Sequence, residues 1–394
     1  MSSNDNNDDV LDEILGNVSS SKEKQEKQIP DVQADKLEVA NEKHSLVEDG
    51  SEVLPGVGVD VGTSNIVVAR QTKDGTFVNR YHRDMLYPLE ASDETQDLLD
   101  RSDYLYVKAG NKFYIVGDDA LKLKNAINEG DIVRPMKDGL LNPSLKESSE
   151  LLFYIIKAVV GDPIVENEPL RFSVPANPVD KDYDNKFHQL VLTNFFKKMG
   201  YDPKPVNEAM AICYDCNPIM KSDEDGDVPL SGVSCSCGGG MTNIALSFKG
   251  MELNAFSVTL SGDYIDESAA KVTGVSSSKV LRQKEKNLDL SSPDMSDNVL
   301  SALYIYYDEV TSRFLHQMSK AFSDKGTDIE GSVEIVVAGG TSMPKGFCEM
   351  IESKISDYNF PFEIYRVRHS ETPFYSVSQG SCIRAQADYK KKQA

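Results

Sequence analysis

The segment GVDVGTSN, residues 58–65, contains the turn on which the interpretation of the whole chain depends. β-Branched residues predict a buried strand over residues 57–61, and a second strand over residues 65–70 follows the turn directly. Gly62 permits a close backbone approach, so the amides of residues 62–65 can point at an anion. Asp60 would repel a phosphate, but it can hold the hydration shell of a Mg²⁺ that bridges phosphates. Alone, the motif also fits an ordinary hairpin.

Two further glycine turns follow along the chain. SCGGGMTN, residues 236–243, places three glycines between two predicted strands. Such a run costs conformational entropy and is best justified where backbone approaches a ligand. VVAGGTSMP, residues 336–344, joins a buried strand to a predicted helix, where backbone can pack flat against a base and ribose. Each turn taken singly also fits an ordinary loop.

Length and charge restrict the class of protein. The chain has 394 residues and a net charge of −21, which suits two domains of about 150–200 residues. The acidic balance argues against a nucleic-acid partner or an anionic membrane surface. No apolar run reaches the roughly 20 residues of a membrane span, and the N-terminus lacks a signal-peptide pattern. Together with six cysteines, this predicts a cytoplasmic protein with free thiols.

Residues 1–54 differ in composition from the rest. They hold 14 Asp and Glu against 5 Lys and Arg, a net of −9, and contain no aromatic Phe, Tyr or Trp. Such a segment cannot bury enough apolar surface to offset its ordering entropy, so we predict a disordered acidic tail. Residues 8–18 place apolar side chains on one helical face, which fits either a short partner-binding helix or a transient helix.

From residue 55 onward, predicted strands alternate with predicted helices, which indicates an α/β fold. Helices are expected over residues 142–160, 182–198 and 344–355, among others. Two known nucleotide motifs are absent. No G-x-x-x-x-G-K-[ST] occurs, and Gly56, Gly58 and Gly62 have the wrong spacing for a dinucleotide fingerprint.

Taken in order, these segments resemble the actin, sugar kinase and heat-shock chaperone ATPase superfamily, and most closely the bacterial actins of the MreB and MamK kind. Six segments carry the resemblance: VDVGTS at 59–64 (phosphate 1), RPMKDG at 134–139 (an MreB-type segment), FSVPA at 172–176 (connecting strand), NEAMAI at 207–212 (the water-positioning Glu), GGGMTN at 238–243 (phosphate 2) and VAGGTS at 337–342 (adenosine). The tail VSQG, residues 377–380, resembles the last turn before the closing helix.

The resemblance implies two α/β lobes around a cleft that binds ATP and Mg²⁺. Lobe I would span residues 55–200 plus a C-terminal helix at about 373–394, and lobe II residues 201–372. Asp60 would order the Mg²⁺ waters and Glu208 the attacking water. The resemblance assigns the nucleotide contacts to Gly62, Thr63, Ser64, Asn65, Gly238, Gly239, Gly240, Met241, Gly262, Asp263, Lys284, Glu285, Gly339, Gly340, Thr341 and Met343. Lys284 and Glu285 fit equally well a solvated helix face, and Glu208 fits a helix N-terminal acid.

Two departures from the superfamily pattern bear on activity. Phosphate-2 motifs usually begin Asp-x-Gly, whereas here Ser236 stands two residues before Gly238. A neutral hydroxyl lacks the charge of a carboxylate near Mg²⁺, so ATP hydrolysis is expected to be slow. The stretch between Glu285 and Val336 is also short, which predicts that lobe II lacks most of its outer subdomain.

The cysteines allow a metal alternative. Cys213, Cys216, Cys235 and Cys237 have a spacing close to that of a zinc ribbon. They fit better as residues of a helix and a strand, with Cys213 in the core and Cys235 and Cys237 on one face of the strand.

Three functions remain open after the sequence has been read. The first is an actin-like cytoskeletal protein that self-associates head to tail into filaments. The second is a non-polymerising ATP-dependent switch or chaperone-like factor that uses the same cleft closure. The third is a small-molecule kinase of the same superfamily. The 134–139 segment favours the first, and the shortened lobe II favours the second.

Overall fold

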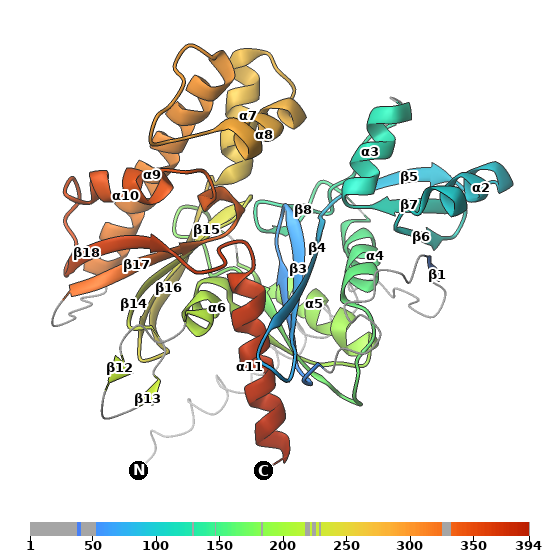
Figure 1. Ribbon diagram of the computed structural model, residues 1–394, viewed down its shortest axis with the longest axis horizontal. Coiled ribbons are helices and arrows are strands. Elements are labelled where there is room, and N and C mark those ends of the chain that lie inside the picture. Colours follow the sequence, from blue (N-terminus) through green and yellow to red (C-terminus); the bar gives the residue numbers. More distant parts are fainter. Residues whose placement is uncertain are drawn as a thin grey trace, which may run out of the picture.

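The computed structural model describes residues 38–40, 53–127, 130–145, 147–182, 184–216, 221–222, 226–227, 230–324 and 332–393. Figure 1 shows two α/β lobes side by side with the C-terminal helix between them. Each lobe is built around a five-stranded mixed sheet. The expected α/β, two-lobed architecture is therefore confirmed.

The sheet of lobe I has the order β11-β10-β2-β3-β4. β2 (Val57–Val61), β3 (Asn65–Gln71) and β4 (Phe77–Arg83) are antiparallel, whereas β10 (Pro169–Val174) runs parallel to both β2 and β11 (Asp202–Asn207). Apolar side chains from α4 (Ser148–Val160) and α5 (Lys186–Lys198) pack with those of this sheet in one buried cluster. β11 belongs to this sheet, so lobe I extends beyond the predicted boundary at residue 200.

A smaller sheet forms the outer part of lobe I, with the order β1-β6-β7-β5. It comprises β5 (Leu86–Glu90), β6 (Tyr106–Ala109) and β7 (Lys112–Val116), next to α2 (Asp93–Ser102) and α3 (Asp118–Ile127). The edge strand β1 (Glu38–Ala40) lies within the tail for which we predicted disorder. The unpaired backbone groups at the edge of β6 give these three residues hydrogen-bond partners. The predicted helix at residues 8–18 lies outside the described residues.

Lobe II has the sheet order β16-β15-β14-β17-β18. Its strands are β14 (Gly232–Cys237), β15 (Met241–Phe248), β16 (Met251–Thr259), β17 (Ser332–Ala338) and β18 (Glu363–His369). Four helices accompany them: α7 (Gly262–Thr273), α8 (Ser277–Asn287), α9 (Asn298–Asp324) and α10 (Phe347–Ile355). Residues 260–324, all of which the structure describes, contain helices and loops but no strand. Two short hairpins complete the fold, β8 (Met136–Lys137) with β9 (Leu140–Leu141) and β12 (Lys221–Ser222) with β13 (Gly226–Asp227).

The C-terminal helix α11 (Ser376–Gln393) packs against β2 and against α6 (Glu208–Asp215). Two glycines make this contact possible. A Cβ at Gly58 would lie 1.9 Å from the Ser378 carbonyl oxygen, and one at Gly380 would lie 1.8 Å from that of Ala211. Because these two glycines have no side chain, α11 can lie directly on β2 and α6, the two elements that carry Asp60 and Glu208.

Three predicted helices begin later than expected. α4 begins at Ser148 rather than residue 142, because the Asn142 side chain accepts a bond from the Ser144 amide and Pro143 has no N–H. α5 begins at Lys186, whose amide is taken by the Asp184 side chain. α10 begins at Phe347, after Gly346 in a left-handed conformation. Among the described residues, no helix is long and apolar enough to cross a membrane.

Candidate functional site

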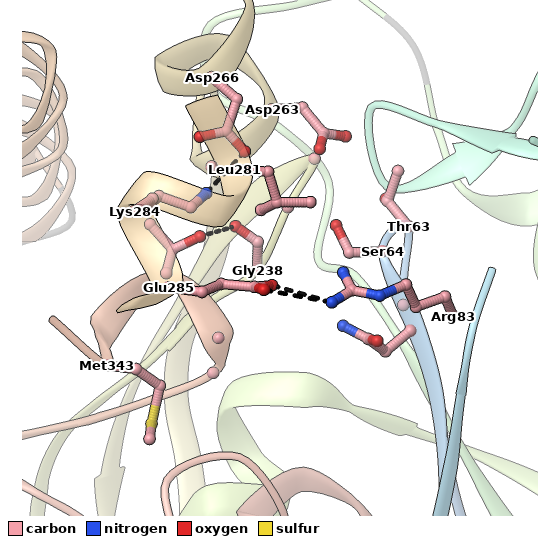
Figure 2. Close-up of a pocket in the computed structure, with 18 of the residues that line it drawn as sticks. Thr63, Ser64, Arg83, Gly238, Asp263, Asp266, Leu281, Lys284, Glu285 and Met343 are labelled. Atoms are coloured by element: carbon pink, nitrogen blue, oxygen red, sulfur yellow. Dashed lines mark hydrogen bonds and ion pairs between the residues drawn. The ribbon is translucent and has the colours of Figure 1, made fainter. Parts of the chain in front are cut away.

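A cavity of about 850 Å³ lies between the lobes, and every one of the predicted site residues lines it. Figure 2 shows side chains from both lobes pointing into this space. We call residues 62–65 the first turn, residues 238–241 the second turn and residues 339–343 the third turn. The fold thus brings three segments that are distant in sequence to one place, while their roles toward a ligand remain predictions.

The first and second turns present free backbone donors. Gly62 donates its amide to the Asn65 carbonyl at 3.0 Å, and Gly238 does the same to Met241 at 2.9 Å, so each turn closes on itself. In the part of the chain that the structure describes, the amides of the residues inside each turn make no hydrogen bond: Thr63 and Ser64 in the first, Gly239 and Gly240 in the second. Adjacent N–H groups of this kind are able to bind an anion.

The two turns also touch each other across the cleft. A Cβ at Gly239 would lie 2.1 Å from the Ser64 hydroxyl, and one at Gly240 would lie 2.3 Å from the Gly139 amide. Neither glycine has a positive φ, so close approach and not backbone conformation requires them. The sequence alone suggests a ligand as the reason for this run; the structure shows that backbone contact with the opposite lobe already requires Gly240, and that Gly239 packs against the Ser64 side chain.

The second turn is held by the start of α7 and by the third turn. The Gly238 carbonyl accepts bonds from the Gly262 amide at 3.2 Å and from the Ser261 and Thr341 hydroxyls at 2.7 Å each. The Asp263 amide donates to the Gly239 carbonyl at 2.8 Å. These bonds fix the second turn as a rigid part of lobe II.

Two carboxyl groups occupy the floor of the cavity. Asp60, on β2, accepts a bond from the Ser173 hydroxyl at 2.8 Å. Glu208 is the first residue of α6, whose N-cap Asn207 accepts bonds from the amides of Ala209 and Met210. Burial raises the pKa of both carboxyls, and the negative charge of Asp60 raises the pKa of Glu208 further.

Ser236 lies on this floor and contacts Glu208 directly. Its hydroxyl donates to Glu208 Oε2 at 3.2 Å, and the Asn243 amide donates to the same oxygen at 2.8 Å. Two neutral donors therefore orient the Glu208 carboxylate. The residue in the place of the superfamily's aspartate is thus a partner of the predicted water-positioning group.

The two predicted nucleoside contacts on α8 are both engaged in ion pairs. Lys284 Nζ lies 2.7 Å from Asp266 Oδ2, with both side chains largely buried. Glu285 forms an ion pair with Arg83 of the opposite lobe, with 3.1 Å between Arg83 Nη2 and Glu285 Oε1. Lys284 is therefore not part of a solvated helix face, whereas Glu285 is nearly half exposed and fits that interpretation in part.

The third turn leaves space for a ligand. A Cβ at Gly340 would meet no atom within 4 Å, in contrast with the crowded second turn. Met343, at the end of this turn, is half-exposed at the edge of the cavity. The open space beside Gly340, where the chain forms a short 3-10 helix (Gly340–Ser342), can accept part of a ligand.

Some lining residues had no signal in the sequence. Arg83 ends the polar strand β4, and only its register opposite Asn65 brings it to the first turn. Asp266 lies one helical turn after Asp263, a spacing that could have indicated a shared face. Lys345 pairs with Asp289 at 2.8 Å beside the third turn, and neither residue belongs to a recognisable motif.

The four cysteines of the metal alternative are all buried. Cys213 contacts the Leu230 carbonyl and the Ser247 hydroxyl, and burial raises the pKa of all four thiols, which disfavours the thiolate that binds metal. Across the described ranges, no three His, Cys, Asp or Glu side chains gather as ligands. Nothing in the described structure supports a zinc ribbon.

The fold is actin-like. A MamK double helical filament matches with a TM-score of 0.60 and 17% identity, over 83% of this chain and 97% of that chain. MreB 5 of Spiroplasma citri bound to AMPPNP matches with a TM-score of 0.58 and 15% identity, over 88% and 99%. The same protein bound to ADP gives 0.57 and 15%, over 86% and 98%. Identities this low establish the fold alone.

The family can be stated more narrowly. The chain belongs to the Volactin family, whose sequence model matches residues 56–385. Among curated proteins, none matches significantly. The resemblance to actin-like proteins that the motifs indicated is therefore confirmed at the level of fold and family.

Asp84 generates a prediction about pH and stability. It is fully buried behind the first turn, where its amide donates to the Ser64 carbonyl at 2.9 Å. Burial raises the pKa of its carboxyl from 3.8 to about 8, although the charge of Arg134 opposes the shift. The unfolded chain therefore releases this proton at lower pH than the folded protein does. Its contribution to stability is full below pH 4 and is lost as pH rises toward 8.

We expect Asp84→Asn to remove this loss. Relative to wild type, the variant should gain at least about 1 kcal/mol of unfolding free energy between pH 5 and pH 8. Urea unfolding at both pH values measures the difference, with the pH 5 pair as the internal control. A wild-type-to-variant difference that stays constant with pH would contradict the prediction.

Proposed function

We propose that this protein binds ATP with Mg²⁺ in the cleft and that the bound nucleotide controls how the two lobes close. One observation carries the proposal. Two unpaired amides from each lobe, Thr63 and Ser64 opposite Gly239 and Gly240, line one cavity above the carboxyl groups of Asp60 and Glu208. Backbone donors from both sides suit a chain of phosphates, whose negative charge they can share. The related MreB 5 structures bound to AMPPNP and ADP support the same choice of ligand.

The residues present fit a water-mediated Mg²⁺ site. Mg²⁺ usually keeps several waters and takes one or two carboxylates together with substrate phosphates. The floor offers Asp60 and Glu208, and no cluster of three or more His, Cys, Asp or Glu ligands occurs in the described part of the chain. When bound, the ion would neutralise phosphate charge, and Asp60 would hold its water shell.

Hydrolysis is proposed to be slow. Glu208 would orient the attacking water, with Ser236 and Asn243 holding its carboxylate. Positioning and charge stabilisation supply most of the catalysis in phosphoryl transfer. Ser236 adds no negative charge beside the metal position, so the nucleotide is held well and turned over weakly.

The preferred function is that of an actin-like cytoskeletal protein whose ATP-bound form assembles head to tail. The match to a MamK filament supports it at the level of fold. A non-polymerising ATP-dependent switch is the second candidate. It is favoured by residues 260–324, which hold helices without the strands of an outer subdomain and so offer less surface for a longitudinal contact.

Gly340→Ala tests the nucleoside site. The added methyl meets no protein atom within 4 Å. The free energy of unfolding without nucleotide should therefore stay within about 0.5 kcal/mol of wild type. If the nucleoside packs on this backbone, ATP affinity should fall about ten-fold, which equals about 1.4 kcal/mol. Titration calorimetry measures the affinity. Unchanged affinity would place the nucleoside elsewhere.

Phosphate release tests the catalytic proposal. Wild type should release phosphate more slowly than an MreB-type actin assayed beside it, and Glu208→Gln should reduce the rate by about 100-fold while ATP still binds. Ser236→Asp should raise the rate about ten-fold by restoring a charge at the metal position. A wild-type rate equal to that of the reference actin would refute slow turnover.

Sedimentation tests assembly. The full chain and a chain starting at Pro55 are centrifuged with ATP, with ADP and without nucleotide. We expect an ATP-dependent pellet for both, and a lower critical concentration for the shorter chain, because residues 1–54 carry a net charge of −9 that repels other copies. No pellet under any condition would favour the switch.

A further inference from the structure

Arg83 joins the two lobes at the edge of the cavity. It is the last residue of β4 in lobe I and is one-fifth exposed. Its Nε lies 2.7 Å from Asp118 Oδ1, at the start of α3 in the same lobe. Its Nη2 lies 3.1 Å and 3.3 Å from the two carboxylate oxygens of Glu285, on α8 of lobe II. Figure 2 shows the guanidinium pointing across the cavity toward Glu285.

The guanidinium has the right shape for this double contact. It is planar and presents several donors in a fixed fork, so one edge can be held by Asp118 while the other meets Glu285. Asp118 thereby sets the orientation of Arg83 before the lobes meet. A lysine, with a single ammonium on a flexible chain, cannot hold both carboxylates in this way.

A second polar contact across the cavity is looser. Arg134 Nη2 lies 3.5 Å from Asp263 Oδ2 and 3.0 Å from the Thr63 carbonyl. Arg134 is thus bonded mainly within its own lobe. Arg83, in contrast, binds both oxygens of its partner in lobe II.

We propose that Arg83 is a positioning residue and a latch: it holds Glu285 across the cleft, so a nucleotide can leave only when this ion pair opens. The inference rests on the proposed function, since it takes a nucleotide as the occupant of the cavity. Arg83 acts through Glu285 and through the separation of the lobes. Because Glu285 and Asp118 are each nearly half exposed, the latch is moderate in strength and weakens with salt.

The first experiment measures release of a fluorescent ATP analogue by stopped-flow chase. Arg83→Gln should speed release about two- to five-fold at low salt, Arg83→Lys should have a smaller effect, and wild type should approach Arg83→Gln near 1 M salt. The double variant Arg83→Gln/Glu285→Gln should release the ATP analogue no faster than Glu285→Gln alone. The reason is that both substitutions remove the same ion pair. Arg101→Gln, an exposed arginine paired with Asp97 on α2, is the matched control and should behave as wild type.

The second experiment needs no nucleotide. Spin labels on exposed sites of each lobe report the distance between the lobes, and Arg83→Gln should broaden and lengthen it while Arg101→Gln should not. An unchanged distance between the spin labels would overturn the latch. The latch would also be overturned if the double variant released the analogue faster by the product of the two single-variant effects. If no nucleotide binds at all, the proposed function fails, and the distance measurement still decides whether Arg83 holds the lobes together.

Discussion

The arrangement of the cleft depends on one constraint, the direct approach of the first and second turns across it. Gly239 lies against the Ser64 hydroxyl, and Gly240 lies against the Thr63 hydroxyl and the Gly139 amide, with no room for a Cβ at Gly240. Since the turns belong to different lobes, this approach sets the separation of the lobes at the base of the cleft. The ion pairs at the edge, from Arg83 and Arg134, span the cleft at that separation.

The same closeness determines the electrostatics of the floor. Asp60 and Glu208 lie at the base of the cleft, and burial raises the pKa of each. A third carboxylate at position 236 would add repulsion whenever no cation is present. Ser236 instead donates a hydrogen bond to Glu208. The hydroxyl at position 236 therefore gives Glu208 a hydrogen-bond donor without adding a charge to the floor of the cleft.

The sequence was sufficient for features that depend on local pattern. Buried strands such as β2 and β17, with their glycine turns, follow from β-branched runs ended by glycine. β4 and β18 were not predicted. Both are edge strands, and their charged residues hide the alternation of apolar and polar residues that marks a strand. The predicted start of α4 was too early, because the Asn142 side chain accepts a hydrogen bond from the Ser144 amide and this local bond competes with the helix. Arg83 could not be predicted, since strand register and the placement of α8 together bring it to Glu285.

Glycine also shows why a motif can locate a site without explaining it. In the sequence, Gly240 and Gly340 look equivalent, each within a glycine run between regular elements. In the structure, Gly240 is required by contact with the opposite lobe, whereas Gly340 faces open space. Two different constraints, closure of the lobes and access for a ligand, thus produce the same residue. Because separate turns meet these constraints, a substitution at Gly340 would leave the contact between the lobes at Gly240 intact.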